Sequence, residues 1–105
     1  MKTVEIKGVE YNIKYTLRAL FIYEELKGEP YSSDRTMNNY ILLYAMLMAC
    51  NKDFPLSFDE VIEVCDDDPS VFKAFVSVLE EENERIRRMA EREPNKKKVR
   101  RVAKG

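Results

Sequence analysis

Hydrophobic and polar residues alternate along residues 3–15, with one interruption at Gly8. This two-residue period on both sides of a glycine is typical of a β-hairpin. The turn falls at Lys7-Gly8 or at Gly8-Val9, and the pattern fits both registers. Because an isolated hairpin is marginal in water, we expect helices to cover its apolar face. That face comprises Val4, Ile6, Val9, Tyr11, Ile13 and Tyr15.

The period changes at Thr16, where a helical pattern begins that ends at Gly28. Threonine is a favourable N-cap residue, and glycine commonly ends helices. A stripe of apolar residues at i, i+3, i+4 and i+7 should face the core: Ala19, Ile22, Tyr23 and Leu26.

Three further large apolar residues lie beside that stripe, namely Leu17, Leu20 and Phe21. A soluble monomer rarely leaves clustered apolar side chains exposed. We therefore predict that these three residues contact another chain, either a second copy or a client helix. The alternative is that the hairpin folds over this side of the helix and buries them.

A polar loop follows, in which a second helix can be capped near Ser33-Asp34, and residues 40–50 are then almost continuously apolar. This run is too short to cross a bilayer, which takes about 20 residues. A helix that is hydrophobic on all sides is the central element of a core. We therefore expect Tyr40–Cys50 to be central.

Two more helices are predicted by their start signals. Ser57 and Glu60 have the spacing of a capping box, while Asp68 and Pro69 suit the N-cap and first position of a last helix that continues to about Arg92. The second half of that helix is highly charged and should project beyond the core. Its apolar side is marked by Phe72, Phe75, Leu79, Ile86 and Met89.

These elements predict an α+β fold that is mostly α, with an N-terminal β-hairpin packed on a bundle of about four helices. The length of 105 residues and the hydrophobic fraction of 45% fit one small domain, which we place at residues 1–93. Residues 94–105 should form a disordered basic tail, because they combine many like charges with little apolar surface.

Charge separates the predicted domain from the tail. The tail has six basic residues and no acidic one, so residues 1–93 have a formal charge of −7. The tail could contact phosphate groups, but it has no aromatic residue to stack on a base, and the acidic domain repels phosphate. Nucleic acid is therefore not the expected partner. The candidate phosphate contacts are Lys96, Lys97, Lys98, Arg100 and Arg101.

Few residues are suited to catalysis or metal binding. The chain has no histidine, and its two cysteines, Cys50 and Cys65, do not make a zinc site, so we expect reduced thiols in a cytoplasmic protein. The run Asp66-Asp67-Asp68 lacks the spacing of a calcium loop and fits a helix N-terminus instead. We predict no catalytic residue, no metal, no cofactor and no membrane partner, and hence no enzyme.

The segment Glu5–Leu26 resembles the opening of the tail assembly chaperones of long-tailed bacteriophages. The resemblance lies in a strand, a glycine turn and a second strand, joined by Thr16 and Arg18 to an apolar helix with late glutamates. It implies a protein that binds the tape-measure protein, keeps it soluble and recruits tail-tube subunits around it. Such a protein would work in the cytoplasm of the bacterial host cell and be absent from the mature virion. Separately, a homo-oligomer is a further expectation, since the second copy is one of the two partners expected at Leu17, Leu20 and Phe21.

A second interpretation comes from a different functional class. In it, the chain is a small helical nucleic-acid-associated regulator whose helices dimerise while the basic tail contacts phosphate. Tail-tube and tape-measure genes beside the coding sequence would favour the chaperone.

Overall fold

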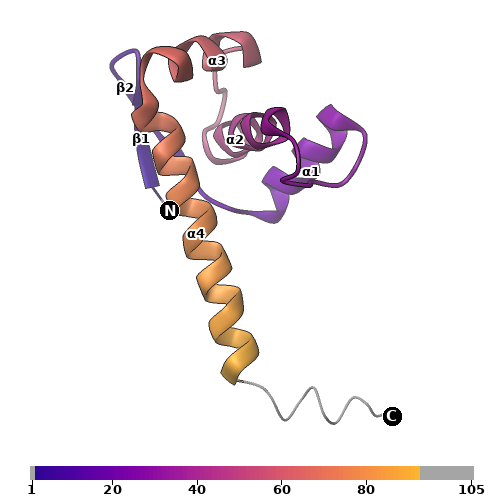
Figure 1. Cartoon of the computed structure of the whole chain (residues 1–105). Coiled ribbons are helices and arrows are strands. Elements are labelled where there is room, and N and C mark those ends of the chain that lie inside the picture. Colours follow the sequence, from indigo (N-terminus) through magenta and orange to yellow (C-terminus); the bar gives the residue numbers. More distant parts are fainter. Residues whose placement is uncertain (1, 93–105) are drawn as a thin grey trace.

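Residues 2–92 are described by a computed structural model, in which a two-stranded antiparallel sheet precedes four helices (Figure 1). This arrangement confirms the predicted α+β, mostly α fold. The predicted tail at residues 94–105 lies outside the described residues. The elements are β1 (Lys2–Ile6), β2 (Val9–Ile13), α1 (Leu17–Lys27), α2 (Thr36–Cys50), α3 (Phe58–Asp67) and α4 (Pro69–Arg92).

The hairpin takes the Lys7-Gly8 turn, one of the two registers that the sequence allowed. Ile6 pairs with Val9, and both turn residues have positive φ, 54° for Lys7 and 80° for Gly8. Two consecutive positive φ angles are typical of the type I′ turn, whose twist matches that of the strands. Val9 is half-exposed because it lies beside the turn, so the apolar face of the hairpin is not buried along its whole length.

The side chain of Asn51, just after α2, attaches the hairpin to the helices. Its Nδ2 donates to the carbonyl oxygen of Asn12 at 2.7 Å, and its Oδ1 accepts from the Asn12 amide at 2.9 Å. These bonds satisfy both backbone groups of one residue in β2, a strand that is paired on only one side.

The predicted limits of α1 are confirmed. Thr16 Oγ1 accepts from the Ala19 amide at 3.0 Å, and Gly28 ends the helix with φ of 82°. This left-handed conformation is accessible to glycine because it has no Cβ.

Helix α2 is the central element, as predicted. It packs against α1, β2 and α3, and its buried side chains are Asn38, Leu42, Leu43, Ala45, Met46 and Leu47. The expected cap near Ser33-Asp34 is wrong, because the helix begins at Thr36. Ser32 holds the preceding segment in a turn instead, since its carbonyl oxygen accepts from Asn38 Nδ2 at 2.9 Å.

The start signals of α3 and α4 are confirmed. Ser57 and Glu60 form both bonds of the capping box, and Asp68 Oδ1 accepts from the Ser70 amide at 3.0 Å. Helix α4 packs on β1 and α3 over its first turns and then continues away from the rest of the molecule (Figure 1). The described residues therefore extend over 53 × 26 × 26 Å. None of these helices is long and apolar enough to span a membrane.

Candidate protein-binding surfaces

The predicted contact surface on α1 is largely open to solvent. Leu17 is 69% exposed and Phe21 60% exposed, and they lie one helical turn apart, opposite the buried Ala19 and Tyr23. Leu20 differs, because it is partly buried and packs against the core. The hairpin does not fold over Leu17 and Phe21. We call these two residues the α1 patch.

A second apolar surface lies where α1, α2 and α3 meet. It is a groove of about 220 Å³ lined by Leu26, Ile41, Tyr44 and Phe58, which we call the α2 groove. Typical small-molecule pockets have volumes of about 300–1,000 Å³, so this groove better suits one or two apolar side chains. Leu26 was expected in the core, but it is half-exposed at this rim because it lies near the end of α1.

Sequence reasoning missed this groove, although a signal for it was present. Met37, Ile41, Tyr44 and Met48 follow one another at spacings of four, three and four residues, so they share one face of α2. None of the four is fully buried, and Met37, at the start of the helix, is 59% exposed. A helix that is apolar on every face leaves an apolar face uncovered wherever its neighbours do not surround it.

Helix α3 brings only negative charge to this region. It has five acidic residues and no basic one, whereas α2 has no charged residue at all. Asp59, Glu63 and Asp66 lie at i, i+4 and i+7 and are all exposed. The face of α3 that contains Val61 is buried in the core. The acidic stripe lies on a different face of the same helix, which is open to solvent.

We expected the run Asp66-Asp67-Asp68 to lie at one helix N-terminus. This expectation is wrong, because the run divides between two helices. Only Asp68 caps α4; Asp66 and Asp67 are the last residues of α3. The C-terminal end of a helix carries partial negative charge, so carboxylates there are unfavourable and basic groups are favoured. No basic residue lies in the last turn of α3.

The end of α4, residues 85–92, is a third surface with exposed apolar side chains. Ile86 is 52% exposed and Met89 45% exposed, and they continue the stripe that Phe75 and Leu79 begin in the core. Arg85 lies against this stripe, because its Nη1 donates to Met89 Sδ at 3.2 Å. We call residues 85–92 the α4 end.

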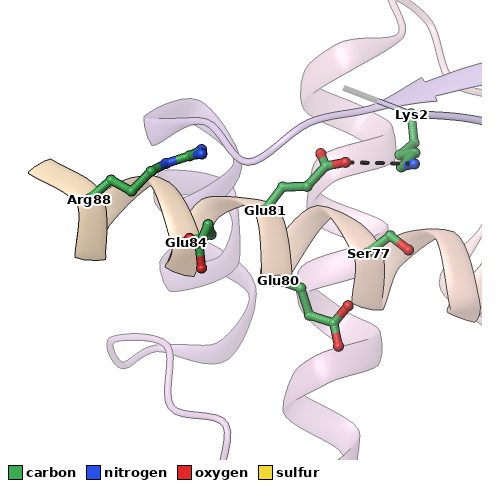
Figure 2. Close-up of a pocket in the computed structure, with 6 residues that line it drawn as sticks. All are labelled: Lys2, Ser77, Glu80, Glu81, Glu84 and Arg88. Carbon is green, nitrogen blue, oxygen red and sulfur yellow. Dashed lines mark ion pairs between the residues drawn. The ribbon is translucent and has the colours of Figure 1, made fainter.

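A recess of about 290 Å³ lies between β1 and α4 (Figure 2). Lys2 points toward Glu81 across it, with Nζ 3.6 Å from Oε2, while Glu80 points away. Both members of this ion pair are about half-exposed, so the pair between the hairpin and α4 contributes little to the stability of the fold. Among residues 2–92, no cluster of three or more carboxylates and cysteines is arranged to hold a metal ion.

A polar recess of about 440 Å³ lies at the loop between α1 and α2. Asn38 lines it, and Asn38 Oδ1 is buried without a hydrogen-bond partner among the described residues. Tyr23 Oη is buried in the same way, and burial, with the charges of Glu29 and Asp34, raises the Tyr23 pKa. Asn38 Oδ1, which lies beside a polar recess of this size, is suited to hydrogen bonding with ordered water.

Both cysteines are free thiols. Burial raises the pKa of Cys50 and that of Cys65, so neither has the lowered pKa of a nucleophilic thiolate. Cys50 Sγ lies 3.8 Å from the carbonyl oxygen of Lys14, near the junction of β2 with α1.

The candidate phosphate contacts in residues 96–101 lie outside the described part of the chain. No family model, curated protein or solved structure matches this chain.

Proposed function

We propose that this protein is a non-enzymatic tail assembly chaperone, which binds the tape-measure protein of a long-tailed phage and helps to recruit tail-tube subunits around it. The proposal starts from the resemblance of residues 5–26 to that family. In the fold, the same segment is the hairpin, the Thr16 cap and α1. On this proposal the protein works in the cytoplasm of the host cell and leaves before the virion is complete.

The exposure of the α1 patch is the observation that carries the proposal. Leu17 and Phe21 are large, apolar and open to solvent, and a chaperone of a long helical client needs such surplus apolar surface. An i, i+4 pair matches the repeat with which an amphipathic helix presents its own apolar residues. Fully burying either side chain against a client stabilises the complex by about 1.5–3 kcal/mol.

On this proposal a tape-measure protein is encoded near this chain, and co-expression of the two proteins is the test. The wild type should keep the tape-measure protein soluble and co-purify with it. The variants Leu17→Glu and Phe21→Glu should lower the soluble yield at least tenfold while their circular dichroism is unchanged. Val9→Glu is the matched control, because Val9 is also about half-exposed but lies on the hairpin turn.

Two results would replace the proposal. One is that the tape-measure protein stays insoluble when co-expressed with the wild type, or binds the α1 patch variants as well as it binds the wild type. The other is a salt-sensitive shift in the gel mobility of DNA or RNA that disappears when residues 94–105 are removed. This result would favour the nucleic-acid-associated regulator.

A further inference from the structure

The polar recess at the loop between α1 and α2 has room for a small molecule. Its volume of about 440 Å³ lies within the range of about 300–1,000 Å³ that is usual for ligand pockets, whereas a water molecule in the liquid takes about 30 Å³. Most ligand pockets are lined by apolar side chains, but this one is lined mainly by polar and charged residues, so it suits a polar ligand. The polar residues of the lining are Lys27, Glu29, Ser32, Asp34, Arg35 and Asn38.

One side chain of this lining indicates a ligand that donates a hydrogen bond. Asn38 is only 4% exposed, and its Nδ2 is already used, because it donates to the carbonyl oxygen of Ser32 at 2.9 Å. Its Oδ1 has no partner among the described residues. A buried acceptor without a hydrogen bond is unfavourable. A ligand that donates to Oδ1 can therefore displace water from this atom without losing the hydrogen bond.

The recess also presents charges of both signs. Two of its residues are basic, Lys27 and Arg35. Two are acidic, Glu29 and Asp34. Within residues 2–92 the ion pairs lie on β1 and α4, and none of them joins these four groups. A ligand with a single charge would be attracted by two of the groups and repelled by the other two, whereas a ligand with both charges can be attracted by all four.

The two helices beside the recess add partial charges of both signs. The lining extends from the last residue of α1 to the first turn of α2, so the recess borders the negative end of one helix and the positive end of the next. No described side chain caps the N-terminus of α2, where Arg35 holds the N-cap position. The amides of this first turn therefore lack a side-chain acceptor and are suited to binding a carboxylate.

We infer that the recess binds a free α-amino acid, whose ammonium group donates to Asn38 Oδ1 and whose carboxylate accepts from the first-turn amides of α2. One carbon atom separates the two groups of such a ligand, so both can reach the same turn of the helix. Glu29 and Asp34 attract the ammonium group. Arg35 and Lys27 attract the carboxylate. The inference uses no residue of the α1 patch and does not depend on the proposed function.

Titration of the full chain with the common amino acids, one at a time, tests the inference. Calorimetry measures the affinity, and the amide chemical shifts of the isotope-labelled protein show where binding occurs. At least one amino acid should bind saturably, with shift changes centred on residues 27–38. The N-acetyl derivative of that amino acid lacks the ammonium group, and the amide derivative lacks the carboxylate. Each derivative should bind more weakly by about tenfold or more, because it loses a hydrogen bond to a charged group.

Two charge-neutral variants distinguish the two ends of the ligand. Arg35→Gln should weaken binding of the amino acid by about threefold but leave binding of the amide derivative unchanged. Asp34→Asn should weaken binding of the amino acid similarly but leave binding of the N-acetyl derivative unchanged. Both positions are exposed, so both variants should fold. Arg18→Gln and Asp59→Asn are the matched controls, since these exposed residues of the same types lie outside the recess and should bind as the wild type does.

The variant Asn38→Leu tests the buried acceptor. Leucine has a similar volume but no polar atom, so this variant should lose binding of the amino acid. It also loses the hydrogen bond to Ser32, and circular dichroism must therefore show that it is folded. Should it not fold, the Arg35 and Asp34 variants decide alone.

Four results would overturn the inference. They are the absence of saturable binding by any amino acid, shift changes centred outside residues 27–38, derivatives that bind as well as the parent amino acid, and Arg35 and Asp34 variants that bind as the wild type does. Saturable binding of inorganic phosphate or of Mg²⁺ at these residues, with no amino acid bound, would make the recess a simple anion or cation site instead.

Discussion

The two halves of α4 have the same apolar period and opposite surroundings. In residues 69–79, Val71 and Phe75 are fully buried against the hairpin and the other helices. In residues 80–92, Ile86 and Met89 hold the equivalent positions and are about half-exposed. Periodicity therefore determines which side of a helix is apolar, but the extent of the neighbouring elements determines how much of that side is covered.

The halves also differ in what holds them in place. The first half begins at the Asp68 cap and stacks Phe72 on Tyr40 with ring centroids 4.4 Å apart. The second half relies on local pairs, Glu82 with Arg85 and Glu84 with Arg87, each three residues apart. Such exposed pairs contribute a few tenths of a kcal/mol each, so this half is held less firmly than the first.

Matched alanine variants should give the largest difference between the halves. Phe75→Ala should destabilise the protein by about 3–5 kcal/mol, because it leaves a cavity in the core. Ile86→Ala should change the free energy of unfolding by about 0.5 kcal/mol or less, since the side chain is half-exposed. Urea titration at a concentration where the protein is monomeric measures both values. Similar losses for the two variants would contradict the division of α4.

Acid should weaken the start of α4, where Asp68 caps the helix. Hydrogen bonds from the Ser70 hydroxyl and amide lower the Asp68 pKa below its usual value of 3.8. A lowered pKa in the folded state means that the cap stabilises the protein above pH 3.8 and is lost as the pH falls through the lower folded value.

The variant Asp68→Asn tests this expectation, because asparagine still accepts the backbone bond but does not titrate. The wild type should melt at a higher temperature than the variant at pH 7, and the gap should narrow between pH 4 and pH 2. Melting curves followed by circular dichroism measure the gap. A gap that stays constant over this range would show that the Asp68 charge contributes nothing.

The smallest effect is expected where the two halves meet. Glu81 pairs with Lys2 at 3.6 Å, but both side chains are about half-exposed, so water screens the attraction. Glu81→Gln should change the free energy of unfolding by about 0.5 kcal/mol or less. Glu80→Gln is the control, since Glu80 points away from Lys2 (Figure 2). A loss above 1 kcal/mol for Glu81→Gln alone would mean that this pair fastens α4 to the hairpin.

Local signals were sufficient to predict the elements of the fold. Thr16, Gly28, the Ser57–Glu60 box and Asp68-Pro69 all act within one helical turn, so their effect can be recognised from spacing alone. The hairpin register needed one further fact, because the alternation fits two turns. The conformation of Lys7 and Gly8 decides between them, and this depends on the twist of the paired strands.

The candidate site was predicted only in part, because exposure depends on residues that are distant in sequence. Leu17 and Phe21 are exposed as expected, whereas Leu20 on the same helix packs on the core. The α2 groove was missed because residues 40–50 are apolar on every side, so the helical spacing of Ile41, Tyr44 and Met48 does not stand out from that of the buried residues.

The sequence by itself determined where most of the helices begin and end, with the start of α2 as the exception, which side of the amphipathic elements is apolar, and that negative charge precedes positive charge along the chain. These properties depend on hydrogen bonds and side-chain spacing within a few residues. The tertiary structure alone decided that α1 and α3 leave one face of α2 uncovered and that Leu20 packs on the core. Burial depends on which surfaces of separate elements meet, and that is settled by packing in three dimensions.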